Sequence, residues 1–298
     1  MDFFKMLENL KTKHTSLVLY CILDRIPIIV FGNNSEKVDK FLIELSDLVH
    51  FRKEIVFYTD FISISDYNSL IQNENIDYNS QRVNIRCPSS VSLRALNEFE
   101  DFYSWLIGFV TPNQNEDLSQ IKHLIRNKLN KYLWITISSN KINLEYKGID
   151  LKLIDLSLEE TILRKISQDT EKAIIRMKRV LSDKIKSNNL DTEFVKTLLD
   201  FENEKKELKK NIFKKEIQNF YSGSKRAFFI FCRLNLLNNL EINTKIGSKT
   251  LLETIDYQEA PIERILSFIN NEWGDNFSIL IDNGKKVFIG DKIQSLWG

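Results

Sequence analysis

Glycine, proline, cysteine and histidine are all scarce in this sequence, which holds nine Gly, four Pro, three Cys and three His among 298 residues. So few glycines and prolines argue against a protein built on phosphate-cradling loops or on many tight turns. Cys21, Cys87 and Cys232 lie far apart, in or beside apolar runs, without the spacing of a metal or redox pair. We expect reduced, buried thiols in a reducing compartment, and therefore a cytoplasmic protein.

Signals for a metal, a membrane or a catalytic group are also missing. The three histidines are scattered and form no pair with metal-ligand spacing. No window approaches about 20 uninterrupted apolar residues, and the charged N-terminus does not resemble a signal peptide. The formal charge of +1 gives no overall field that would attract nucleic acid or an anionic membrane. We expect no cofactor, no metal and no catalytic residues, and the sequence leaves the oligomeric state open.

Short apolar runs alternate with amphipathic stretches over residues 1–155, which predicts an α/β domain with a mostly parallel, three-layer sheet. Its first pieces are a buried helix over 16–23, a strand over 28–32, a helix after the capping residues 33–35, and a strand over 55–58. This order predicts that the two strands form a parallel pair. We further expect strands over 82–86, 133–138 and 141–146, helices over 92–106 and 118–130, and a polar loop over 65–81.

Residues 156–298 have a different character and predict a helical region with a small α+β tail. Ser157 to Glu160 is a capping-box pattern ahead of a long amphipathic stripe. Asp191 can cap a second long helix, which would form a hairpin with the first. An aromatic-rich helix or strand over 227–240, a helix over 261–271 and a hairpin-like strand over 286–289 complete the region. The sequence leaves open whether residues after about Asn188 form a separate domain or pack on the first.

Gly32, between a strand and a helix, stands where a phosphate-binding loop would lie in an open α/β sheet. The loop lacks a second glycine, and Lys37 is not followed by Ser or Thr. Glu36 and Asp39 would also oppose phosphate charge. We interpret the segment as an ordinary strand-to-helix turn.

A basic run on the second long helix is the strongest charged feature. It contains Lys205, Lys206, Lys209, Lys210, Lys214 and Lys215, and aromatic residues are interleaved with it. Such a face, extending to Arg226, can hold nucleic acid. Glutamates on the same helix supply near-neighbour ion pairs, so a solvated helix explains the run as well.

A second charged cluster, Phe51 to Glu54, joins a buried helix to a buried strand. Asp60 follows that strand, at the end where open α/β sheets commonly place ligands. A polar connection without a binding role accounts for the same residues. The two interpretations remain side by side.

The order of pieces from Leu10 to Asp155 resembles the central part of the DENN domain, a family that includes exchange factors for Rab-type small GTPases. An apolar helix ends at Asp24-Arg25 and is followed by the strand Ile26–Phe31. The step Leu48–Phe51 then leads into a second strand, and Trp105–Val110 occupies the place of an apolar "PfliG" step. The resemblance covers about half of the chain and consists of pattern and order.

This resemblance implies a lobe that binds a small GTPase and works by deforming its switch regions, without proton-transfer groups. It suggests Arg52, Lys53, Asp60 and Asp66 as partner contacts, and guanine-nucleotide exchange as the activity if there is one. Two other hypotheses stay open. One is a nucleic-acid-associated protein that uses the basic helix face of residues 205–226, and the other is an α/β enzyme with a site assembled from distant residues.

Overall fold

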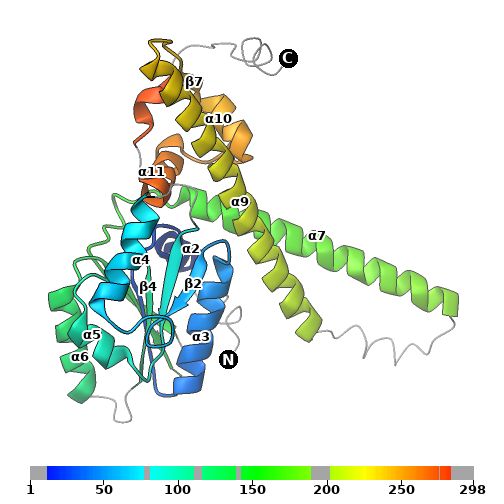
Figure 1. Ribbon diagram of the computed structural model, residues 1–298. Helices are drawn as coiled ribbons and strands as arrows, with labels where there is room; N and C mark the ends of the chain where they lie inside the picture. Colours follow the sequence, from blue (N-terminus) through cyan, green and yellow to red (C-terminus); the bar gives the residue numbers. More distant parts are fainter. Residues whose placement is uncertain are drawn as a thin grey trace.

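The computed structural model describes residues 12–76, 81–110, 116–138, 142–188, 202–274 and 276–282. Residues 12–147 form a six-stranded sheet with helices on both faces, and two long helices with smaller elements follow (Figure 1). The α/β class and the helical second region are therefore as the sequence predicts. The expected strand over 286–289 and the expected helix cap at Asp191 lie outside the described residues.

The sheet has the strand order β2-β3-β4-β1-β5-β6. The five parallel strands are β1 (Ile28–Gly32), β2 (Lys53–Val56), β3 (Val83–Cys87), β4 (Trp105–Val110) and β5 (Tyr132–Ile137); β6 (Ile142–Lys147) pairs antiparallel with β5. The prediction that the first two strands pair directly is wrong, because β4 and β3 lie between β1 and β2. Only the parallel direction was correct.

Alternate residues of the central strands face two separate cores. Ile28 and Val30 of β1 pack with α2 (Thr12–Leu23) and α3 (Ser35–Leu48), whereas Ile29 and Phe31 pack with helices on the other face. Those helices are α4 (Ile64–Ile76), α5 (Ser92–Glu98) and α6 (Glu116–Lys128). Strands buried on both faces read as continuous apolar runs, which is why β1 was visible in the sequence.

The segment predicted as a polar loop is α4. Ser63 and Asp66 cap its first turn, since the Ser63 hydroxyl donates to the Asp66 carboxylate at 2.8 Å and accepts from its amide at 3.2 Å. The apolar positions 67, 70 and 71 have helical spacing. The fourth position of this stripe is the buried Glu74, so a carboxylate interrupted the pattern.

The predicted helix over 92–106 ends at Glu98, and Trp105–Val110 is the central strand β4. A six-residue apolar run does not distinguish a buried strand from a buried helix by periodicity alone. Gly108 lets α3 approach this strand, because a Cβ there would lie 2.8 Å from Val38 Cγ1. A glycine inside an apolar run, such as Gly108, thus indicates a strand against which a helix packs closely.

The C-terminal elements share one hydrophobic core with the α2 and α3 face of the sheet. They are α7 (Ser157–Asn188), α9 (Glu202–Asn239), β7 (Ile246–Gly247), α10 (Ser248–Ile255), α11 (Ile262–Trp273), a 3-10 turn η1 (Ser278–Leu280) and β8 (Ile281–Asp282). The predicted segment 227–240 is the end of the single helix α9. Figure 1 shows α7 and α9 in contact beside the lobe and separating farther out. The described elements from α9 to β8 thus pack on the first lobe.

Candidate functional site

The carboxyl ends of β1 and β5 are closed. The crevice between Gly32 and Ile137 holds only about 10 Å³, which is room for about one water molecule. A Cβ at position 32 would lie 2.8 Å from Val38 Cγ2, so the first turn of α3 presses directly against the strand end. Asn34 caps α3 by accepting from the Lys37 amide at 2.9 Å. This edge has the geometry of a strand-to-helix turn and no space for a phosphate group.

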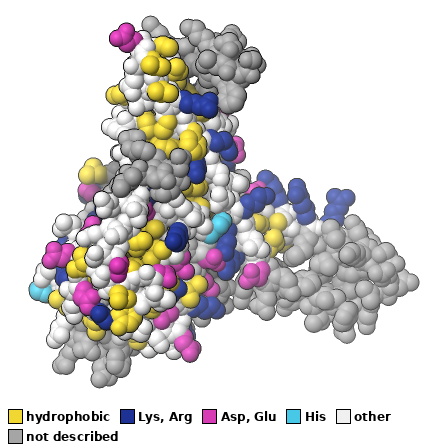
Figure 2. All heavy atoms as spheres, viewed as in Figure 1, with side chains coloured by type: hydrophobic (Ala, Val, Ile, Leu, Met, Phe, Trp, Pro, Cys, Tyr) yellow, Lys and Arg dark blue, Asp and Glu magenta, His cyan; other side chains and the backbone are white. Residues whose placement is uncertain are grey.

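The carboxyl end of the outer strand β2 is different, because large apolar side chains are exposed around it. Figure 2 shows hydrophobic side chains on this side of the lobe, beside charges of both signs. We call the set the carboxyl-edge patch. It consists of Tyr58, Ile62, Ile64 and Leu93, with exposed fractions of 46, 54, 50 and 53%.

The patch rests on a packed aromatic base. Phe57 and Phe61 bracket the turn and are buried, with ring centroids 5.3 Å apart, and both pack against Trp105. Tyr58 has a left-handed backbone with φ of 71°, and its side chain is exposed while those of Phe57 and Phe61 are buried. Such a conformation is held only where the surroundings determine it. The turn that carries Tyr58 is therefore held in one conformation.

Arg94 links the turn to α5. Its guanidinium stacks on the Tyr58 ring at 4.7 Å, donates to the Tyr58 hydroxyl at 2.8 Å and pairs with Glu98 at 2.7 Å. Leu93, the preceding residue of α5, is also exposed. The patch draws on three segments of chain, and Arg94 joins two of them.

Two of the four predicted partner contacts lie at this patch. Asp60 stands inside the turn and accepts from the Val56 amide at 2.7 Å. Asp66 accepts from the Ile62 amide at 3.4 Å, and hydrogen bonds from the Ser63 hydroxyl and from main-chain amides lower the pKa of its carboxyl. Both side chains are exposed and also fix local structure. Lys53 is exposed but starts β2, at the opposite end of the strand.

Arg52 is not a surface residue. Its side chain is fully buried, pairs with Glu272 of α11 at 2.6 Å and donates to the carbonyls of Ile22 and Leu23 at 2.7 and 2.8 Å. The expectation of a partner contact at this position is therefore wrong, because the guanidinium is buried and already donates to acceptors within the chain. The arginine joins the α/β lobe to the C-terminal helices.

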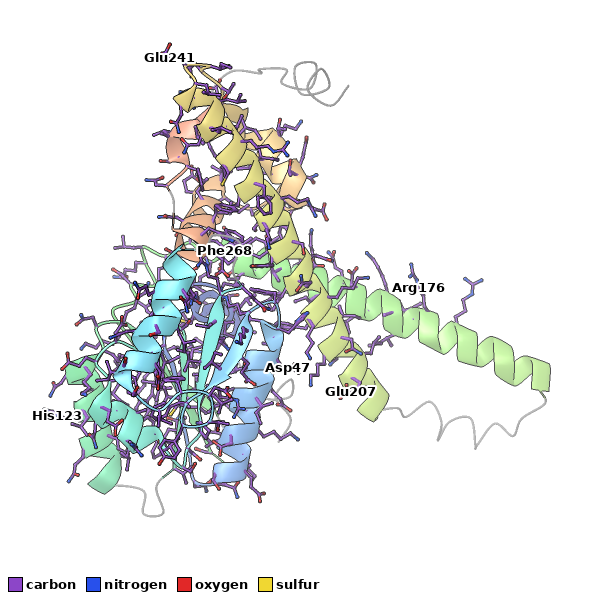
Figure 3. All side chains as sticks on the ribbon, in the orientation of Figure 1. Asp47, His123, Arg176, Glu207, Glu241 and Phe268 are labelled. Carbon is purple, nitrogen blue, oxygen red and sulfur yellow. The ribbon has the colours of Figure 1, made fainter. Side chains whose placement is uncertain are left out.

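The basic run on α9 is partly neutralised by α3. Lys210 and Lys214 reach the Asp47 carboxylate at 3.0 and 2.6 Å, where α3 approaches α9 (Figure 3). Burial opposes the effect, but the two ammonium groups outweigh it and lower the pKa of Asp47. These lysines hold two helices together. Lys215 is exposed and Lys209 half-buried, and the side chains of Lys205 and Lys206 lie outside the described part.

The amino edge of the sheet carries a buried ionic network that the sequence interpretation missed. We call it the amino-edge network; its members are Arg25, Arg52, Arg82, Glu74 and Glu272. Arg25 pairs with Glu74 at 2.7 Å, and Arg82 donates to the carbonyls of Glu74 and Glu272. Each arginine comes shortly before a strand. That repeated position was a signal available in the sequence.

A fourth buried arginine, Arg264 of α11, extends this connection. It binds Asp24 at 2.8 Å and Glu159 of α7 at 2.6 Å. The two carboxylates outweigh the effect of burial and raise the pKa of Arg264, so the guanidinium stays charged. Helix α11 is thus anchored to the lobe by two ion pairs of opposite polarity. Its Glu272 pairs with Arg52 of the lobe, and its Arg264 pairs with Asp24 of the lobe.

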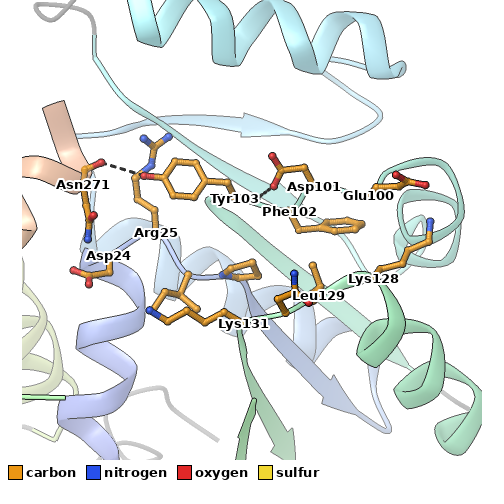
Figure 4. A pocket seen from close by; sticks show the side chains of 13 residues that line it. Asp24, Arg25, Glu100, Asp101, Phe102, Tyr103, Lys128, Leu129, Lys131 and Asn271 are labelled. Atoms are coloured by element: carbon orange, nitrogen blue, oxygen red, sulfur yellow. Dashed lines mark hydrogen bonds between the residues drawn. The ribbon is translucent and has the colours of Figure 1, made fainter. Parts of the chain in front are cut away.

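Beside this network the amino ends of β1, β4 and β5 border a cavity of about 440 Å³, which we call the amino-edge cavity (Figure 4). Three loops of the lobe and Asn271 of α11 line it. Tyr103 forms one wall, and its hydroxyl donates to the Asn271 carbonyl at 3.1 Å. The hollow side of the sheet is therefore the amino edge.

Metal and thiol chemistry find little support in the described part of the chain. No group of three or more His, Cys, Asp and Glu side chains there is arranged to hold a metal ion. Burial raises the pKa of the Cys21 and Cys87 thiols, which makes them poor nucleophiles. None of the described helices combines the length and the apolar character needed to cross a bilayer.

Comparisons of this chain with protein-family models, with curated proteins and with solved structures find no significant match.

Proposed function

We propose that this chain is a regulatory interaction module without catalytic chemistry of its own. It binds a protein partner through the carboxyl-edge patch, and a small GTPase is the partner to examine first. The observation that carries the proposal is the exposure of four large apolar side chains around one rigid turn. Contiguous apolar surface on a folded protein commonly marks an interaction site.

The composition of the patch fits a protein interface. Tyrosine and arginine are enriched at interface centres, and charged groups belong at the rim. Here Tyr58 and Arg94 stack at 4.7 Å beside the isoleucines, while Asp60 and Asp66 stand at the margin. The aromatic base beneath limits the ordering cost of binding, because the turn is already held in one conformation.

The choice of a small GTPase comes from the DENN resemblance of residues 10–155. An exchange factor of that kind needs a complementary rigid surface, since it acts by stabilising an altered shape of its partner. A closed crevice at Gly32, with room for about one water, agrees with a lobe that holds no nucleotide itself. Within this proposal Asp60 and Asp66 are polar contacts at the rim.

The test is binding and nucleotide release with purified small GTPases, each in its GDP-bound and nucleotide-free forms. The patch variant is Ile62→Asp with Ile64→Asp, and the matched control is Leu153→Asp, an exposed leucine near the opposite margin of the sheet. Loss of two central apolar contacts should weaken binding by about 30-fold or more. The control should bind like the unaltered chain.

Two results would count against the proposal. Absence of binding to every GTPase would remove that class of partner. Equal binding by the patch variant and the control would show that the interface lies elsewhere on the molecule.

A further inference from the structure

The amino-edge cavity lies on the seam between the α/β lobe and the C-terminal helices. Its loops precede β1, β4 and β5, and α11 supplies Asn271 from the other side. A volume of about 440 Å³ is within the usual range for small-molecule sites, which often lie at such junctions. Tyr58 and the rest of the carboxyl-edge patch lie toward the opposite ends of the strands, so this cavity is a separate feature.

Several charges in the cavity wall are already satisfied internally. Asp24 binds Arg264 at 2.8 Å, and Arg25 binds Glu74 at 2.7 Å. The Lys128 ammonium donates to two main-chain carbonyls at 3.1 and 3.0 Å. These groups shape the cavity, but they have little capacity left for a ligand.

Four of the remaining polar side chains are divided between two ends. Figure 4 shows Lys131 and Asn271 toward one end, and Glu100 and Asp101 toward the other. Lys131 has no acidic partner within ion-pair distance among the described residues, and its nearest recorded contact is the Tyr20 ring at 5.6 Å. Among the described residues Asp101 accepts only from the Tyr103 amide, at 3.1 Å, which leaves an oxygen for a ligand.

The middle of the cavity is apolar and firmly held. The Tyr103 ring is stacked by the Arg25 guanidinium at 4.4 Å and is fixed at its hydroxyl by the Asn271 carbonyl. Pro27 and Leu129 also line the cavity. A ligand that fits must therefore carry opposite charges at its two ends and an apolar portion between them.

We propose that the amino-edge cavity binds a small zwitterion with an apolar middle, of the size of a free amino acid or a dipeptide. The ligand carboxylate pairs with Lys131 and the side-chain amide of Asn271. Its ammonium group pairs with Glu100 and Asp101. Because Asn271 belongs to α11, the bound zwitterion connects the two parts of the chain.

Calorimetric titration of the full chain tests this, with L-phenylalanine and glycyl-L-phenylalanine as probes. Each probe is compared with its C-terminal amide, which lacks the carboxylate, and with its N-acetyl derivative, which lacks the ammonium group. A hydrogen bond to a charged group contributes about 1.5–3 kcal/mol, so each derivative should bind about tenfold more weakly or worse. If either probe binds more tightly than both of its derivatives, the proposal is supported. The probe that does so shows whether the ligand has the length of an amino acid or of a dipeptide.

Two variants assign the ends. Lys131→Gln should abolish the preference for the acid over the amide and keep the preference for the free amine. Glu100→Gln with Asp101→Asn should do the reverse. Lys245→Gln, an exposed lysine outside the cavity, is the control and should keep both preferences. The proposal is overturned if neither probe binds saturably, if the unaltered chain shows only one of the two preferences, or if the variants leave both intact.

Discussion

At the carboxyl edge the central strands end against apolar side chains, whereas at the amino edge they end against arginines and carboxylates. At the carboxyl edge the end of β1 is closed by the chain that directly follows it, since Val38 packs behind Gly32. The amino edge is sealed by distant partners, since Arg52 meets a carboxylate 220 residues away. Closure by neighbouring residues completes the carboxyl edge without distant segments of chain. Its surface is therefore available for the protein partner proposed above. Contacts with distant partners close the amino edge only in part, because the amino-edge cavity of about 440 Å³ remains between the lobe and α11.

The largest effect expected at the amino edge comes from Glu272→Ala. It leaves the fully buried Arg52 without its carboxylate, and an uncompensated buried charge costs about 3–5 kcal/mol. Urea unfolding measures the loss. Adding Arg52→Met should recover part of the stability, because no unpaired charge then remains. A loss below about 1 kcal/mol would show that water reaches this junction.

At the carboxyl edge the corresponding change is Gly32→Ala. The added methyl group would meet Val38 Cγ2 at 2.8 Å, and overpacking of this kind costs about 1–3 kcal/mol. In a Val38→Ala background the same change should cost close to nothing, since the space is then present. A double-mutant cycle by chemical denaturation measures the coupling. Additive effects would contradict the close packing of α3 on β1.

A smaller effect is expected from Tyr103→Phe, at the wall of the amino-edge cavity. The change removes the hydroxyl that donates to the Asn271 carbonyl at 3.1 Å, a hydrogen bond that contributes about 0.5–1.5 kcal/mol. Thermal unfolding measures it. Tyr146→Phe is the control, because Tyr146 is exposed and its hydroxyl has no recorded partner among the described residues. Equal effects of the two changes would show that the hydrogen bond between Tyr103 and Asn271 of α11 does not stabilise the fold.

The smallest effect concerns Asp47, whose pKa is lowered from 3.8 by Lys210 and Lys214. A lowered carboxyl pKa stabilises the folded chain above the unfolded pKa, and this contribution is lost as pH falls through the folded value. Asp47→Asn should therefore cost about 1 kcal/mol or less at pH 7, since the side chain is 33% exposed and solvent screens both ion pairs. The difference from the unaltered chain should shrink below about pH 4. Urea unfolding at pH 7 and pH 3 tests it, and a constant difference would exclude ionisation as the cause.

Much of the fold could be predicted because its signals are local. The β-branched run before Gly32, the Asn34 cap and the long stripe after Ser157 each specify an element from neighbouring residues. The helix predicted over 261–271 is confirmed as α11 for the same reason. Pairing of strands is not local, and the expected β1–β2 pair failed because two later strands insert between them.

The candidate sites were harder to predict than the elements. Asp60 was predicted as a contact because it follows a strand, Asp66 was suggested together with it, and both lie beside the carboxyl-edge patch. The exposed Tyr58 depends on an outward turn that no pattern specified. Arg52 looked like a surface charge because its partner, Glu272, is invisible from the neighbouring sequence. A charged residue is usually exposed, so exposure is the default prediction from sequence. A buried ion pair can be predicted only when both partners have been located.

The separation between Arg52 and Glu272 also has a consequence for synthesis. Ribosomes add about 5–20 residues per second, so on the order of 10–40 s pass between the two residues. During that interval the lobe leaves the ribosome with Arg52 and Arg82 lacking acceptors that only α11 provides. The amino edge must then stay open and hydrated on the nascent chain. Completion of α11 is the event that dehydrates it.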